Sequence, residues 1–195
     1  MSKIMLKPVF ILPVFLLPNG CTRLRVFEQR YLKLIKLASN TDGFIIAINT
    51  ELDAIAADVK IINFEQGSDG VLIVDVCCTQ LVKLQKTDID ADNLMMAETK
   101  NIDHWADNVD KHDPANTSDL SKEFRYLSKS LIKVFEQNDT LSQIFHENFF
   151  EHKYWVVARW IELLPIPIEK KQIFYSYDSF HKAVRFIYEV LAEQK

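Results

Sequence analysis

PVFILPVFLLPNGCTRLRVFEQRY, residues 8–31, is the most informative segment of the chain. Prolines interrupt its apolar run at Pro8, Pro13 and Pro18. Proline lacks the amide hydrogen that a central strand donates, so we expect this backbone to lie at sheet edges or bends. A small sheet cannot bury both faces of such a strand, and the segment therefore predicts large apolar side chains on an open face.

A turn, a strand and a helix follow the last of these prolines. Residues 18–20, PNG, have the composition of a turn. Residues 24–27, LRVF, alternate apolar and charged side chains, as in a half-buried strand. Residues 28–38 place apolar side chains near helical spacing, and SNTDG at 39–43 ends that pattern. The sequence thus predicts a strand that leads directly into a short helix.

This segment resembles the amino-terminal, substrate-binding domain of the ATP-dependent protease Lon, which is also found in stand-alone bacterial proteins and in cereblon. The family pattern is roughly PLFPL, an apolar pair with Pro-Gly-Gly, and then LPLRIFEPRY. The resemblance implies a PUA-like barrel that binds polypeptide substrates. The residues that match are Pro8, Phe10, Leu12, Leu16, Pro18, Gly20, Leu24, Arg25, Phe27, Glu28, Arg30 and Tyr31.

The rest of the first half contains further short strands. GSDG at 67–70 is a hairpin signal, because glycine supplies positive φ and aspartate tolerates it. Short, mostly antiparallel strands with one early helix predict an α+β fold that begins with a small barrel over residues 1–102. The resemblance extends through this region and implies that the barrel is PUA-like. The expected strands are residues 44–48, 55–64, 71–76, 81–84 and 94–102.

The chain changes character after residue 102. Residues 103–118 lack an apolar pattern and are predicted to be a linker. Residues 119–195 have apolar side chains at helical spacing, which predicts a helical bundle. Within it, WVVARWIELLPIPIEKK at 155–171 is similar to the Lon-type domain, where an apolar helix ends in Leu-Leu-Pro.

Composition and charge narrow the classes of partner. The net charge of −4 argues against sequence-independent binding of nucleic acid, which needs a basic face. No stretch approaches the roughly 20 apolar residues of a membrane span. Three cysteines, two of them adjacent, are expected to be reduced thiols of a cytoplasmic protein. The alternative, an export signal ending near Cys21, is disfavoured because prolines interrupt the apolar run.

Catalytic motifs are not evident. The chain contains no GxxxxGK nucleotide loop, and the adjacent Ser128 and Lys129 would face apart on a helix. His104 and His112 lie in the predicted linker without the spacing of a metal site. We therefore expect no enzyme activity, no cofactor and no metal: a Lon-type binding domain without the ATPase and protease domains.

Two functions remain open. The first, implied by the resemblance, is binding of unfolded or extended polypeptide, linked to proteolysis or protein quality control. A protease or chaperone is a possible further partner, and a weak homodimer is also possible. The second is RNA binding, since PUA-like barrels also occur in RNA-binding proteins; the acidic charge tells against it. A tryptophan cage for small molecules is not expected in the barrel. The proposed polypeptide-binding residues are Phe10, Phe15, Leu17, Arg25, Phe27, Glu28, Arg30 and Tyr31.

Overall fold

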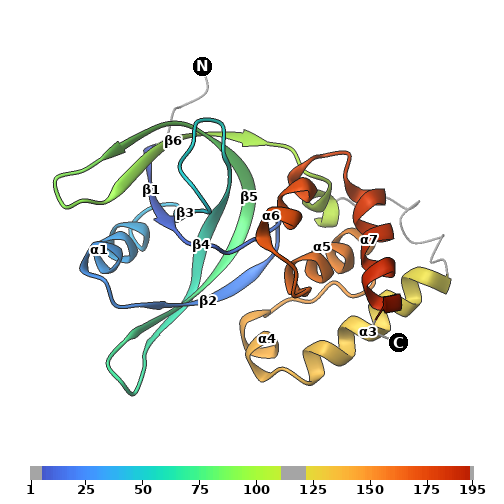
Figure 1. Ribbon diagram of the computed structural model, residues 1–195. Coiled ribbons are helices and arrows are strands. Elements are labelled where there is room, and N and C mark those ends of the chain that lie inside the picture. The colour runs from blue at the N-terminus through green and yellow to red at the C-terminus, as the bar shows by residue number, and fades with distance from the viewer. Residues whose placement is uncertain (1–5, 111–121, 194–195) are drawn as a thin grey trace. The chain divides into compact units, whose positions relative to one another are not determined.

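The computed structural model describes residues 6–110 and 122–193 (Figure 1). Its internal contacts divide the chain into two compact units, with the boundary between Asp103 and His104. We call the first the sheet unit and the second the helical unit. Within the described residues, no helix combines the length and the apolar character needed to cross a membrane.

The sheet unit is a six-stranded sheet with one helix. Its strand order is β2-β5-β4-β3-β1-β6, and an additional pairing between β5 and β6 closes the sheet on itself. Among the strand pairs of residues 6–110, only β1 and β3 are parallel, and the other pairs are antiparallel. The predicted α+β class is therefore confirmed. The elements are β1 (Leu6–Ile11), β2 (Cys21–Val26), α1 (Gln29–Ala38), β3 (Phe44–Ala47), β4 (Ile55–Gln66), β5 (Leu72–Ile89) and β6 (Met95–Ile102).

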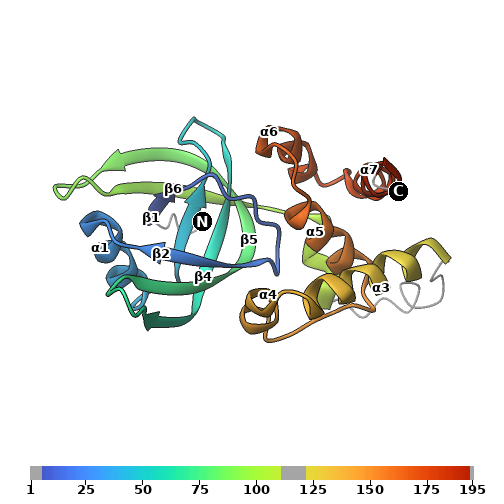
Figure 2. The same ribbon diagram turned by 60° about the horizontal axis from the view of Figure 1, so that its bottom comes forward.

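Closure depends on β5, an 18-residue strand where the sequence predicted two shorter ones. Figures 1 and 2 both show it as a long curved strand. Its first part pairs with β2 and β4, and its second part pairs with β6. The Asp-Gly hairpin before it is as expected, with Gly70 at φ 80°. The two parts appeared separate because Cys77, Thr79 and Gln80 interrupt the apolar pattern, although Cys77 and Gln80 still pair with β4 and only the register shifts at Thr79.

Pro8 lies where β1 is paired on one side only, and Pro13 and Pro18 lie outside the strands, as expected for prolines at sheet edges or bends. β1 pairs with β6 through Leu6–Pro8 and with β3 through Val9–Ile11. Pro8 faces Met96 of β6 and has no partner in β3, so the missing amide hydrogen can lie on the unpaired side. A strand that changes partners halfway can therefore accommodate a proline within a closed sheet.

The helical unit is built around aromatic side chains. The Trp155 ring packs edge-on against Phe145 and Phe150, with ring centroids 5.9 and 5.2 Å away. Phe135 also packs against it, at 5.8 Å. The elements are η1 (Trp105–Asp110), α3 (Lys122–Glu136), α4 (Asp139–Ile144), α5 (Lys153–Leu163), α6 (Ile168–Lys171), η2 (Gln172–Tyr175) and α7 (Phe180–Glu193).

The start of the predicted linker belongs to the helical unit. His104 and Trp105 are 1% and 3% exposed, at the beginning of the short helix η1. The Trp105 indole donates a hydrogen bond to Ser179 Oγ at 2.9 Å. A buried histidine and a single buried tryptophan leave no apolar periodicity, which is why the sequence pattern missed them. The remainder of the predicted linker, residues 111–118, lies outside the described residues.

His104 makes the helical unit sensitive to acid. Its Nε2 donates to the Phe174 carbonyl at 2.8 Å and its Nδ1 accepts from the Ala106 amide at 3.1 Å, so the bonding pattern requires a neutral ring. Burial lowers the pKa of His104 from 6.5 to about 4, an effect that the bond to Phe174 opposes. The unfolded chain therefore binds this proton at a higher pH than the folded chain does.

We expect the free energy of unfolding of the helical unit to have its full value above pH 6.5. It should fall by about 3 kcal/mol as the pH drops towards 4. Urea titrations followed by tryptophan fluorescence test this directly, because all three tryptophans lie in residues 104–195. The variant His104→Gln should lose most of the dependence between those two pH values. Parallel curves for the two proteins would contradict the assignment.

Candidate functional site

The interior of the closed sheet changes from apolar to polar towards one end. Successive residues of a strand face opposite sides, so residues two apart share a face. Val9, Ala56, Val82 and Ala97 belong to one buried apolar cluster. Moving two residues along each strand from these positions reaches polar side chains: Lys7, Asp58, Gln80 and Thr99. A polar layer therefore covers the apolar core at this end of the barrel.

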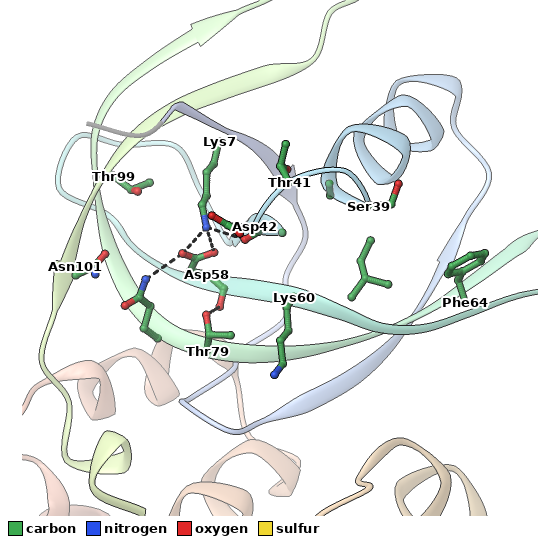
Figure 3. A pocket seen from close by; sticks show the side chains of 14 residues that line it. Lys7, Ser39, Thr41, Asp42, Asp58, Lys60, Phe64, Thr79, Thr99 and Asn101 are labelled. Carbon is green, nitrogen blue, oxygen red and sulfur yellow. Dashed lines mark hydrogen bonds and ion pairs between the residues drawn. The ribbon is translucent and has the colours of Figure 1, made fainter. Parts of the chain in front are cut away.

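An ion pair between β1 and β4 forms the centre of this layer (Figure 3). Lys7 Nζ lies 2.7 and 2.8 Å from the two carboxylate oxygens of Asp58, and it also donates to the Asp42 carbonyl at 2.9 Å. Gln80 Nε2 donates to Asp58 Oδ2 at 3.2 Å. Both charged residues are buried, at 8% and 3% exposed. The network gives each charge a partner and several hydrogen bonds, which a buried ion pair requires.

A cavity of about 740 Å³ opens above the ion pair. This volume lies within the usual range for ligand pockets, and barrel mouths are a common place for them. One wall comes from the end of α1 and the loop after it, and another from β4. Figure 3 shows the hydroxyl and amide side chains of Thr79, Thr99 and Asn101 around it. The lining is Lys7, Ala38, Ser39, Thr41, Asp42, Gly43, Asp58, Lys60, Ile61, Phe64, Thr79, Gln80, Thr99 and Asn101.

An incompletely paired strand edge borders the same cavity. β3 pairs with β4 only as far as Val59, through the partner Phe44. From Lys60 to Gln66, β4 pairs with β5 on one side, and no other strand of the described residues pairs with its opposite side. Phe64 on this segment is 64% exposed and lines the cavity. The site therefore combines open main-chain groups, an exposed aromatic ring and a polar floor.

The residues predicted from the sequence lie elsewhere. None of the eight lines this cavity. Arg25, Phe27, Glu28 and Arg30 are at least partly exposed, with Phe27 at 69%, whereas the other four are at most 7% exposed: Phe10, Phe15, Leu17 and Tyr31.

The prediction of an open apolar face before Pro18 is thus wrong. Residues 15–17 are buried, at 6%, 3% and 0% exposed. The loop between β1 and β2 is tied to the sheet at both ends, because Leu12 N donates to Ala47 O and Asn19 N donates to Cys78 O. Phe10 stacks on Tyr31 of α1, with centroids 3.9 Å apart. These large apolar side chains therefore build the core.

Three of the exposed predicted residues form ion pairs at the surface. Arg25 pairs with Asp69 at 2.5 Å, and Arg30 pairs with Glu28 at 2.9 Å. The Arg30 guanidinium also lies over the Tyr31 ring, 4.6 Å from its centroid. Glu28 is the N-cap residue of α1, but its side chain makes no capping hydrogen bond. Of the eight predicted residues, only Phe27 presents a large unburied apolar surface.

Sequence reasoning missed Lys7, Asp58 and Phe64. A signal for the first two was present, because each is a charge within an otherwise apolar strand, at the face that alternation assigns to the core. The exposed Phe64 has no such signal, since it follows apolar residues that predict a buried strand. The described residues contain no group of three or more His, Cys, Asp or Glu side chains placed to hold a metal ion.

Comparison with models of known protein families identifies one family that matches this chain. A sequence model of the ATP-dependent protease La (LON) substrate-binding domain matches residues 7–193. The fold is similar to that of a Lon N-terminal domain protein from Xanthomonas campestris, with 24% identity, a TM-score of 0.64 and coverage of 97% of this chain and 98% of that one. A search of curated protein sequences found no match.

A second solved structure has a similar fold. The N-terminal domain of the Mycobacterium avium complex Lon protease has 10% identity and a TM-score of 0.62, and the alignment covers 95% of this chain and 97% of that one. At these identities the likeness establishes the fold alone. Both alignments span the sheet unit and the helical unit, so the two units together correspond to the matched domain.

Proposed function

Because the chain belongs to the Lon substrate-binding domain family, we propose that it binds unfolded or extended polypeptide segments without cleaving them, as a contribution to proteolysis or protein quality control. The matched family model describes a substrate-binding domain and no catalytic domain. The proposal places the binding surface at the barrel mouth and along β4.

The observation that carries this proposal is the open edge of β4 from Lys60 to Gln66. An open edge offers unpaired N–H and C=O groups to any extended chain, and strand addition is a common way to recognise peptides. Main-chain pairing is largely independent of side chains, so it suits a protein that binds many sequences. The neighbouring Phe64 ring adds an apolar contact for one residue of the bound segment.

The cavity beside this edge would receive a side chain of the bound segment. Its walls present hydroxyl and amide groups from Ser39, Thr41, Thr79 and Asn101. A side chain in the cavity therefore meets hydrogen-bond partners above the floor that Lys7 closes. Such a lining favours polar or mixed side chains over long aliphatic ones.

Nucleic acid fits this site less well. The cavity lining carries two lysines and two aspartates, and Lys7 is already paired with Asp58. A phosphate backbone needs several cations that lack nearby carboxylates. RNA remains the second ligand of the test, because its binding would fall steeply with salt.

The experiment is fluorescence anisotropy with labelled casein as an unfolded polypeptide and a labelled RNA oligonucleotide, each across a salt series. We expect casein to bind and its affinity to survive salt. Phe64→Ser should weaken casein binding about tenfold, the loss expected for one apolar contact of about 1.4 kcal/mol. Tyr177→Ser in the helical unit, which removes another exposed aromatic ring, should change nothing.

Two further comparisons locate the surface. Phe27→Ser tests the position predicted from sequence, and a larger effect there than for Phe64→Ser would move the site to the strand β2 region. A short peptide from casein with N-methylated alternate amides should bind more weakly than its unmodified form, because methylation removes main-chain donors. Equal affinity for the two peptides would exclude strand addition.

A further inference from the structure

Two cysteines that are distant in sequence meet on paired strands. Cys21 of β2 and Cys77 of β5 are direct register partners. Their Sγ atoms lie 2.7 Å apart, only slightly farther than the about 2.05 Å of a covalent S–S bond. Both residues are partly exposed, whereas the neighbouring Cys78 is 1% exposed and its thiol points to the Gln80 carbonyl.

The backbone geometry of the pair suits a bond. Cys78 N donates to Gly20 O at 2.7 Å and Cys78 O accepts from Asn19 N at 2.8 Å, so Cys78 occupies a hydrogen-bonded position. Hydrogen-bonded and non-hydrogen-bonded pairs alternate along an antiparallel ladder, which makes Cys21 and Cys77 a non-hydrogen-bonded pair. The Cα atoms of such pairs are about 4.5 Å apart, within the range of about 4.4–6.8 Å that disulfides use.

We propose that Cys21 and Cys77 are an oxidation-sensitive dithiol that forms a reversible disulfide across β2 and β5 by exchange with a small disulfide such as oxidised glutathione. One cysteine thiolate attacks glutathione disulfide and releases one glutathione thiolate, leaving a mixed disulfide on the protein. The second cysteine thiolate attacks the protein sulfur of that mixed disulfide and releases the second glutathione. The protein loses two electrons and two protons, and one glutathione disulfide becomes two glutathione thiols.

The bridge would tie together the part of the sheet unit that carries the candidate site. The ring it closes contains α1, β3 and β4, and therefore the open edge and most of the cavity walls. Among the strands that the structure describes, β2 lies at an edge and pairs with β5 alone. A covalent link at its first residue prevents β2 from separating and limits the freedom of the unfolded chain. Oxidation is therefore expected to stabilise the sheet unit.

The test uses the full chain, reduced and then equilibrated in glutathione buffers of increasing oxidised fraction, trapped with an alkylating agent and weighed by mass spectrometry. We expect the number of alkylated cysteines to fall from three to one, with no glutathione attached, and peptide mapping to find Cys21 joined to Cys77. Dithiothreitol should reverse the change. Cys78→Ala is the matched control and should behave like the parent protein.

Other results would overturn the proposal. These are three alkylated cysteines in every buffer, a glutathione adduct that persists, or a bridge that includes Cys78. The same titration in guanidinium chloride removes the strand pairing. If the Cys21 to Cys77 bridge forms there as readily as in the folded protein, the structure does not promote it. The parent protein alone decides the outcome, so the result does not depend on the folding of any variant.

Discussion

Replacing Asp58 by alanine is expected to lower the free energy of unfolding of the sheet unit by about 3 kcal/mol. Lys7 would remain at the barrel mouth with its charge and only the Asp42 carbonyl to receive it. The loss of one partner of a buried ion pair is costly because the remaining charge is poorly solvated. Urea titrations followed by far-ultraviolet circular dichroism measure the effect, since the tryptophans report on the helical unit.

Two variants show whether burial is the cause. Glu28→Ala removes a carboxylate from the exposed pair with Arg30, whose side chains are 46% and 39% exposed, and should cost at most about 1 kcal/mol. The double variant Lys7→Met, Asp58→Leu removes both charges and should regain most of the stability lost in Asp58→Ala. Equal losses for Asp58→Ala and Glu28→Ala would show that the barrel mouth is as well hydrated as the surface.

The parts of the fold that the sequence predicted are those encoded by local patterns. The Asp69-Gly70 turn between two apolar runs specified the β4–β5 hairpin, and helical spacing specified α1. The length of β5 was not predictable locally, because Cys77, Cys78 and Gln80 are held in the strand by pairing with the distant strand β4. The length of the strand depends on pairing with strands that are distant in sequence, and no local pattern in a single sequence indicates that pairing.

The candidate site was missed for a related reason. Large apolar side chains before Pro18 are compatible with either a core or a binding face. Phe15 and Leu17 are buried because hydrogen bonds hold the loop between β1 and β2 against the sheet at both ends. The open edge of β4 arises because β3 is only four residues long, so that beyond Val59 β4 is paired with β5 on one side only. An edge of this kind is a property of relative strand lengths rather than of any motif.

Gly43→Ala is expected to destabilise the sheet unit by about 3 kcal/mol or more, through backbone strain and a steric clash together. Gly43 has φ 86°, which disfavours residues with a side chain. A Cβ at this position would lie 1.9 Å from the Val59 carbonyl oxygen and 2.9 Å from its carbon. Both atoms belong to the backbone of β4, so the contact is relieved only by moving a strand.

Gly70→Ala separates the two causes, because Gly70 has a similar φ of 80° but a Cβ added to it would have no atom within 4 Å. It should cost only about 1 kcal/mol, the penalty for positive φ alone. The difference between the two variants, measured by urea titration, therefore reports the contact between Gly43 and β4. Because Val59 is the last residue of β4 that pairs with β3, moving it would also widen the cavity and lengthen the open edge. Gly43→Ala should then alter casein affinity where Gly70→Ala does not, and equal stability losses would contradict the close approach.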